Sequence, residues 1–297
     1  MRKIALHELF DEVFLDKAVL AKPYIADRTI NISQEENISL FIKKCISETK
    51  NAKISGAHRK NDWAEGWSGS GVYYSELAYN NLPYYFYKNT HVRCGTKVYK
   101  DESGFVEYDL LRALQAISFY EFIGSSSDAT IFEFGCGTGS NIQFLSTIYP
   151  LATFFGSDWV QTAITKLIEN QIVPRGNAKL VDYFNNSTFP QMDENYIAFT
   201  NASLEQAGEN YHEFMNFLIE DPRCLKGIHI EPVREIMDLR NPLNVQSYFY
   251  AEKRNYLTKF IDFLNSKNLK LIQQQDYGIG SKYISGYQVV TWSKSLE

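Results

Sequence analysis

A glycine-rich junction at residues 131–141 carries the clearest chemistry in this sequence. It reads Ile-Phe-Glu-Phe-Gly-Cys-Gly-Thr-Gly-Ser-Asn, an apolar strand pattern followed by three alternate glycines and the start of a helical pattern. Glycine lets the backbone turn sharply and approach a ligand closely, and a helix start offers free backbone N–H groups. The acid Glu133, two residues before the first glycine, suits a ligand that carries an ammonium group. The loop residues assigned to this binding site are Gly135, Cys136, Gly137, Gly139 and Asn141.

The spacing of the glycines distinguishes this loop from a dinucleotide site. A dinucleotide site has the pattern G-x-G-x-x-G, with glycine or alanine at its last position. Here that position is Ser140, and the third glycine comes one residue early. A second acid, Asp158, lies about 20 residues beyond the loop, where ribose hydroxyls are bound in such folds. We therefore predict a nucleoside ligand with an ammonium group rather than a nicotinamide dinucleotide.

Alternating strand and helix patterns follow from residue 128 and must position these residues. Strands are predicted at Thr130–Phe134, Thr153–Ser157, Ala178–Tyr183, Tyr196–Thr200 and Gly227–Glu231, and helices at Ser140–Ile148, Gln161–Ile172, Tyr211–Ile219 and Val245–Leu264. Such alternation predicts an α/β fold with a doubly wound, mostly parallel sheet. Two further strand patterns, Leu269–Gln274 and Tyr287–Trp292, have no helix between them, so we expect an antiparallel pair at one edge.

The first hundred residues follow a different pattern. One helix is predicted around Leu6–Val13, and a second from Ser33, with Glu36 completing a capping box. A dense aromatic stretch then runs from Trp63 to Tyr99; it includes Trp67, Tyr73, Tyr74, Tyr79, Tyr84, Tyr85, Phe86 and Tyr87. Aromatic side chains are usually buried, but they also stack on flat or sugar-like ligands. We expect residues 1–104 to form a helical and aromatic cap that binds the acceptor, and residues 105–297 to form the core.

The glycine loop together with Asp158 resembles motif I and the following acid of class I S-adenosylmethionine-dependent methyltransferases. The resemblance covers Phe105 to the C-terminus and implies a Rossmann-like sheet of seven strands. It also implies S-adenosyl-L-methionine as the cofactor, with Asp158 on the ribose hydroxyls and Trp159 against the adenine. Further cofactor contacts implied by position are Asp182 and Tyr183 near the adenine, and Asn201 and Ala202 beneath the methionine part.

The acceptor is indicated by a weaker resemblance. The sequence lacks the Asn/Asp-Pro-Pro-aromatic tetrapeptide that accompanies methylation of nucleobase or glutamine amino groups, and it lacks acids that match a catechol-type magnesium site. The segments 229–235, 253–257 and 286–292 resemble a bacterial methyltransferase group associated with surface-polysaccharide and sugar modification. This resemblance implies O-methylation of a sugar or similar polyol. Glu231, which ends the fifth predicted strand, is the first candidate base, followed by Glu205 and His212. Methylation of nitrogen or carbon in a natural product or peptide, and a non-catalytic S-adenosylmethionine-binding regulator, remain alternatives.

Composition and net charge limit the kinds of molecule that we expect the protein to bind. With 30 Lys and Arg against 35 Asp and Glu, the net charge is −5, which argues against nucleic acid as the main partner. The four cysteines are scattered without metal-binding spacing, so we expect reduced thiols, no metal and a cytoplasmic location. We expect no signal peptide, and no run of about 18 apolar residues predicts a membrane span. A small-molecule or glycan acceptor is the expected partner, and a homodimer stays open.

Overall fold

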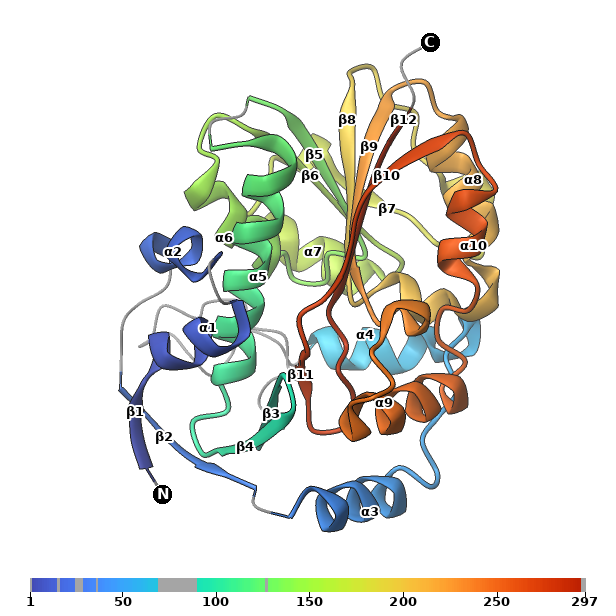
Figure 1. Ribbon diagram of the computed structural model, residues 1–297. Coiled ribbons are helices and arrows are strands. Elements are labelled where there is room, and N and C mark those ends of the chain that lie inside the picture. The colour runs from blue at the N-terminus through green and yellow to red at the C-terminus, as the bar shows by residue number, and fades with distance from the viewer. Residues whose placement is uncertain are drawn as a thin grey trace.

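The structure is a computed structural model that describes residues 2–14, 17–24, 29–35, 37–68, 90–125 and 128–294. Its strands form a seven-stranded sheet and a separate five-stranded sheet (Figure 1). The larger sheet has the order β10-β12-β9-β8-β5-β6-β7. Its parallel strands are β5 (Thr130–Phe134), β6 (Thr153–Asp158), β7 (Ala178–Leu180), β8 (Tyr196–Asn201) and β9 (Cys224–Glu231). The predicted α/β class and mostly parallel sheet are confirmed.

The predicted antiparallel pair at one edge of this sheet is also confirmed. Its strands are β10 (Leu269–Asp276) and β12 (Gln288–Lys294). The later strand, β12, pairs antiparallel with β9, so β10 is the outermost strand.

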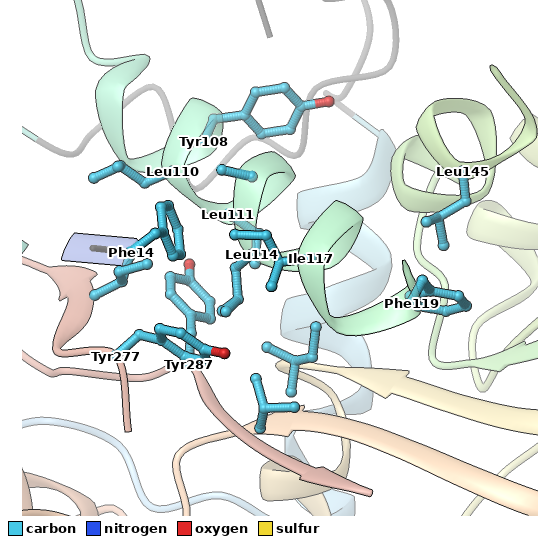
Figure 2. Close-up of a cluster of buried hydrophobic side chains, with 14 of the residues drawn as sticks. Phe14, Tyr108, Leu110, Leu111, Leu114, Ile117, Phe119, Leu145, Tyr277 and Tyr287 are labelled. Atoms are coloured by element: carbon cyan, nitrogen blue, oxygen red, sulfur yellow. The ribbon is translucent and has the colours of Figure 1, made fainter. Parts of the chain in front are cut away.

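Helices cover both faces of the seven-stranded sheet. On one face lie α5 (Val106–Ile123), α6 (Ser140–Ile148) and α7 (Gln161–Glu169), and on the other lie α8 (Tyr211–Glu220) and α10 (Phe260–Asn265). Successive strand residues point to opposite faces of the sheet. Ile131 therefore packs against α5, α6 and α7, and Phe132 packs against α8 and α10. Figure 2 shows that α5 carries many of the buried side chains on the first of these faces, among them Leu111, Leu114 and Ile117. The sheet is thus buried on both faces, as its continuous apolar strands require.

The single helix predicted at Val245–Leu264 is wrong, because two helices occupy this stretch. They are α9 (Pro242–Lys253) and α10. Between them, Asn255 and Lys259 have positive φ angles of 54° and 55°, which a right-handed helix cannot contain. The start of α9 is fixed by the Asn241 side chain, which accepts a hydrogen bond from the Leu243 amide at 3.0 Å.

The N-terminal part contains strands that the sequence patterns did not reveal. The five-stranded antiparallel sheet has the order β1-β2-β4-β3-β11. Its strands are β1 (Arg2–Ala5), β2 (Thr29–Gln34), β3 (His91–Cys94), β4 (Lys97–Asp101) and β11 (Ile279–Ser281). The helices of this part are α1 (Leu6–Phe14), α2 (Ala18–Ala21), α3 (Ile38–Glu48) and α4 (Lys60–Ser68). Short 3₁₀ segments lie at Lys22–Tyr24, Ala57–Arg59, Arg175–Asn177, Asn186–Thr188, Leu204–Asn210 and Arg234–Ile236.

The capping box predicted at Ser33 is wrong. Ser33 lies in β2, where it pairs with Lys100 of β4. Helix α3 begins instead at Ile38, and the side chain of Asn37 caps it by accepting a hydrogen bond from the Leu40 amide at 3.0 Å. Buried residues alternate with exposed ones along the segment that contains Ser33, which is the pattern of a strand. This burial outweighs the local preference of Ser33 for a helix cap.

Candidate active site

The predicted glycine loop connects β5 to α6 at the carboxyl end of the sheet. Gly135, Gly137 and Gly139 have φ angles of 73°, 56° and 82°, the left-handed region that favours glycine. A Cβ atom at Gly135 would lie 2.4 Å from the Ser203 Cβ, so a larger residue would displace its neighbour. Cys136 closes the turn by donating its amide to the Ser157 carbonyl at 2.7 Å. The spacing of the glycines therefore reflects both backbone conformation and close packing.

Glu133 presents a carboxylate oxygen that has no partner. Its side chain is fully buried, and its Oε1 accepts a hydrogen bond from Asn141 Nδ2 at 2.5 Å. Its Oε2 is also buried and has no hydrogen-bond donor among the described residues. Burial raises the pKa of Glu133 to about 7, although the Asn141 hydrogen bond acts in the opposite direction. A buried acceptor without a donor is costly to keep and points to a ligand that supplies one.

Two residues of α5 that the sequence patterns did not predict, Arg112 and Gln115, form hydrogen bonds around Asn141. Arg112 Nη1 donates to Asn141 Oδ1 at 2.8 Å, and Gln115 Nε2 donates to the same oxygen at 3.0 Å. Gln115 also donates to Asn201 Oδ1 at 3.1 Å. The sequence signal was available, because these polar side chains interrupt the apolar pattern of α5. They link Glu133, through Asn141, to the end of β8.

Asp158, at the end of β6, binds the glycine loop directly. Its Oδ2 accepts a hydrogen bond from the Gly137 amide at 3.0 Å, and its Oδ1 accepts one from the Val160 amide at 3.1 Å. Burial raises the pKa of Asp158 to about 6, and the two backbone donors limit the rise. The structure thus places Asp158 in contact with the loop that follows Glu133 in the chain.

A first cavity, of about 40 Å³, lies beside this loop. Its lining includes predicted cofactor residues from four strand ends, namely Gly135, Asp158, Trp159, Tyr183 and Ala202. The Tyr183 hydroxyl lies 3.2 Å from Ser203 Oγ, which donates in turn to the Phe134 carbonyl. Asp182 forms an ion pair with Lys60 Nζ at 2.8 Å, and both Asp182 and Tyr183 lie beyond the end of β7, which stops at Leu180 rather than at Tyr183.

Helix α4 closes this first cavity from the N-terminal part. Trp63 and Trp67 line the cavity, and their rings stack with centroids 5.7 Å apart. Trp67 packs so closely on the glycine loop that a Cβ at Gly137 would lie 2.7 Å from its ring. Most of the aromatic stretch named above, Tyr73 to Tyr87, lies outside the described residues. The described part shows that α4 belongs to the site.

A second, larger cavity of about 250 Å³ shares Trp63, Ala202 and Gln206 with the first. Charged residues, Arg59, Glu107, Glu205 and Arg254, and three tyrosines, Tyr250, Tyr256 and Tyr287, contribute to its lining. Its lining is therefore polar and aromatic together, and it comes from both the N-terminal part and the core.

The three predicted catalytic candidates occupy different surroundings. Glu231 is fully buried, and its two oxygens accept hydrogen bonds from the amides of Ser203, Leu204 and Glu205 at 3.1–3.2 Å. Burial raises the pKa of Glu231 well above its usual range. Both oxygens have donors from the chain and, unlike Asp158, Glu231 lines neither cavity, so these surroundings indicate a structural role.

His212 and Glu205 differ from Glu231 and from each other. His212 is exposed on α8, bonds the Glu209 carbonyl through Nδ1 at 2.9 Å, and lines neither cavity. Glu205 lines the second cavity. Its Oε1 accepts from Gln206 Nε2 at 2.9 Å, while its buried Oε2 has no donor among the described residues. Of the three, only Glu205 lines a cavity. Its carboxyl group also interacts with that of Glu231, by charge repulsion and by a side-chain hydrogen bond, and this adds to the effect of burial in raising the pKa of Glu231.

The described residues contain no helix long and apolar enough to cross a membrane. Within the same residues, no group of three His, Cys, Asp or Glu side chains is placed to hold a metal ion. All four cysteines are buried and unpaired.

Among known proteins, similarity to this chain was found only in solved structures. No protein-family model and no curated protein matches the chain. The plantazolicin methyltransferase BpumL in complex with SAH aligns at 17% identity over 86% of this chain and 100% of its own, with a TM-score of 0.48. Magnesium protoporphyrin IX methyltransferase from Synechocystis PCC 6803 with bound SAM aligns at 12% identity over 64% of this chain and 81% of its own, with a TM-score of 0.42. Human N-acetylserotonin methyltransferase in complex with SAM aligns at 15% identity over 64% of this chain and 56% of its own, also with a TM-score of 0.42.

Proposed function

We propose that the protein is an S-adenosylmethionine-dependent methyltransferase. The observation that carries the proposal is the buried Oε2 of Glu133, which has no donor among the described residues and precedes a glycine loop that Asp158 binds. A nucleoside that carries an amino-acid ammonium group satisfies both features, since the ammonium supplies the missing donor and the ribose hydroxyls meet a carboxylate. The groups of S-adenosylmethionine match this chemistry.

Four of the predicted cofactor residues contact the cofactor directly in this proposal. Glu133 binds the ammonium group, and Asp158 binds the ribose hydroxyls. Trp159 and Tyr183 line the first cavity, where they provide aromatic surface for the adenine. When bound, the cofactor supplies a methyl group on a sulfonium, which is transferred by in-line displacement. The protein therefore has to align an acceptor with that methyl group and exclude water.

We place the acceptor in the second cavity, and propose that it is a hydroxyl of a sugar or another polyol. Carboxylates accept hydrogen bonds from hydroxyls, and aromatic rings stack on the apolar faces of sugar rings. Glu205 is the proposed general base, because it lines this cavity and its Oε2 has no donor among the described residues, so this oxygen can accept the hydroxyl proton as the hydroxyl oxygen attacks. Nuclear magnetic resonance of the product distinguishes this proposal from methylation on nitrogen or carbon.

Cofactor binding is the first test of the proposal. Calorimetry should show that the chain binds S-adenosylmethionine and S-adenosylhomocysteine but not NAD. Asp158→Ala should weaken binding by about 1–3 kcal/mol, because it leaves polar partners without an acceptor. Asp238→Ala is the matched control, since Asp238 is half exposed and pairs with a surface arginine. Binding of NAD without binding of either sulfur compound would contradict the proposal.

Turnover is the second test. Mass spectrometry should detect a methylated product when S-adenosylmethionine is offered with a panel of nucleotide sugars and cell-envelope glycan fragments. Binding of the cofactor without transfer to any acceptor class would favour a non-catalytic regulator.

A further inference from the structure

The second cavity is lined by a guanidinium that has an unsatisfied hydrogen-bond donor among the described residues. Arg254 follows the last turn of α9 and lines this cavity. Of its side-chain nitrogens, only Nη1 has an acceptor among the described residues, the Tyr250 hydroxyl at 2.9 Å. Its Nε is buried without an acceptor. Among the described residues, Glu205 is close enough to attract the guanidinium charge, but no hydrogen bond joins the two side chains. Arg254 is half-buried, and a buried hydrogen-bond donor such as its Nε normally has an acceptor, so the hydrogen bonding of Arg254 is incomplete.

The side chain is held in place rather than loosely packed. The Arg254 guanidinium carbon lies 5.7 Å from the ring centroid of Tyr250 and 5.1 Å from that of Tyr256. Its backbone is fixed as well, because the Ser55 amide donates to the Arg254 carbonyl at 2.8 Å. Cation–π contacts stabilise the charge without using the N–H groups of the guanidinium plane. Apart from Nη1, which donates to Tyr250, the donors therefore remain for another molecule.

Another arginine, Arg93, shows the case in which every side-chain nitrogen donates a hydrogen bond. Arg93 of β3 is completely buried. Its three side-chain nitrogens nevertheless all donate, for example to the carbonyls of Ser281 at 2.9 Å and Leu243 at 2.8 Å. Arg93 thus needs no ligand, whereas Arg254 has a donor left over and faces a cavity.

We infer that Arg254 binds an oxyanion of the methyl acceptor, a phosphate or a carboxylate, in the second cavity. The inference rests on the proposed function and narrows its acceptor to an anionic polyol. A guanidinium plane matches both oxyanions, and its hydrogen bonds to them are stronger than those between neutral groups. Arg59 lines the same cavity and adds a second positive charge.

The carboxylates of the cavity fit the same assignment. Glu107 accepts a hydrogen bond from the Tyr287 hydroxyl at 2.8 Å, and the Oε2 of Glu205 has no donor among the described residues. Arginine and carboxylate side chains together suit one acceptor with two kinds of group. The oxyanion binds at Arg254, and a hydroxyl of the same molecule lies at Glu205.

The experiment measures binding of defined probes to the full chain in the presence of S-adenosylhomocysteine. The probes are UDP-glucose and glucose 1-phosphate for phosphate, glucuronate for carboxylate, and uncharged methyl glucoside as the neutral counterpart. Phosphate and carboxylate probes identify the source of the oxyanion, and preference for either one supports the inference. Arg254→Met keeps the length of the side chain and removes its charge, whereas Arg254→Lys keeps the charge and removes the planar fork. Arg240→Met is the matched control, because the Arg240 side chain is 91% exposed.

We expect at least one anionic probe to bind more tightly than methyl glucoside. Arg254→Met should weaken that binding about 10- to 100-fold, the usual effect of losing hydrogen bonds to a charged group. Arg254→Lys should weaken it less, and Arg240→Met should not change it. S-adenosylhomocysteine affinity should stay the same in all three variants. Equal affinity for neutral and anionic probes, or equal losses in the Arg254→Met and Arg240→Met variants, would overturn the inference. Failure of cofactor binding in the parent would instead overturn the proposed function.

Discussion

At the scale of single residues, Glu133 should make cofactor affinity depend on pH. Its pKa of about 7 means that the carboxylate becomes protonated as the pH falls through neutrality. A protonated carboxyl group cannot pair with an ammonium group, so the dissociation constant should rise by up to about tenfold for each pH unit below that value. Titration calorimetry with S-adenosylhomocysteine from about pH 8 to about pH 5.5 measures this change.

The Glu133→Gln variant separates this effect from the second acid. It should bind weakly near neutral pH and show little change in affinity between about pH 8 and about pH 6.5, because residue 133 no longer titrates. Below that range a smaller dependence should remain, since the pKa of Asp158 is about 6. An affinity of the parent that stays constant across neutral pH would contradict the ammonium assignment.

Glu205 and Glu231 should respond differently to loss of charge. Glu205→Gln should leave cofactor affinity and thermal stability nearly unchanged, and lower turnover about 10²–10⁴-fold, as loss of a general base does. The reason is that Glu205 lines the acceptor cavity and that one of its oxygens has no donor among the described residues. Steady-state kinetics and thermal unfolding of the same preparation measure both effects.

Glu231→Gln is the matched comparison. Its new amide would face the backbone donors of Ser203, Leu204 and Glu205, so one acceptor oxygen would be lost. We expect unfolding to become easier by about 1–3 kcal/mol. Normal stability of this variant with strongly reduced turnover would return the base role to Glu231.

The sequence predicted only some residues of the site. Glu133, the glycines and Asp158 form a short local pattern in which backbone conformation restricts the residue types, so their spacing was informative. Arg112 and Trp67 belong to segments outside that pattern, and only the fold brings them to the loop. No local rule distinguishes Glu205 from Glu231, because the difference lies in which one accepts backbone N–H groups.

At the scale of elements, the contact between α4 and the glycine loop can be tested with two glycines. Gly137 and Gly95 have similar φ angles, 56° and 59°. A Cβ at Gly137 would lie 2.7 Å from the Trp67 ring, whereas a Cβ at Gly95 would have no atom within 4 Å. Both alanine variants place a Cβ at a similar positive φ, so the difference between their stabilities reports mainly the contact with α4.

Gly137→Ala should therefore destabilise the protein by about 1–3 kcal/mol more than Gly95→Ala, the usual range for overpacking. It should also weaken cofactor binding and change tryptophan fluorescence, because Trp67 has to move from the first cavity. Chemical denaturation and calorimetry of both variants measure these effects. Equal losses in the two variants would show that α4 does not press on the loop.

The patterns predicted the elements of the large sheet better than those of the small one. Strands β5, β6, β7 and β8 begin at the predicted residues, because each is an apolar run in a regular alternation with helices. The strands of the small sheet have three to six residues, and β11 pairs with β3 from the other end of the chain. Such short strands depend on partners distant in sequence, and local periodicity cannot reveal them.

At the scale of the whole molecule, the two parts expected on either side of residue 105 share the five-stranded sheet. Gly280 of β11 pairs with Arg93 of β3, which places a strand of the core part in the N-terminal sheet. Arg93 also donates to Leu243 and Ser247 of α9 at 2.8 and 2.9 Å. The two parts thus share both backbone hydrogen bonds and a buried guanidinium.

The buried surface of α5 connects the same two parts. Figure 2 shows Phe14 of α1 beside Tyr277 and the apolar side chains of α5, and the rings of Phe14 and Tyr277 lie 5.6 Å apart. We therefore propose that residues 1–104 and 105–297 fold as one cooperative unit, with the acceptor cavity formed between them.

A chain that starts at Phe105 tests this cooperativity. It would expose the α5 surface that Phe14 covers and leave β11 without its partner strand. We expect it to aggregate or to unfold over a broad temperature range, whereas the full chain should show one sharp transition by circular dichroism and by fluorescence. Arg93→Met in the full chain is the milder counterpart, since it removes the guanidinium donors to the carbonyls of Ser281 and Lys282. It should lower the single transition temperature without splitting it. A shortened chain that unfolds sharply and binds S-adenosylhomocysteine as the parent does would show instead that the core is an independent domain and that the shared sheet contributes little to its stability.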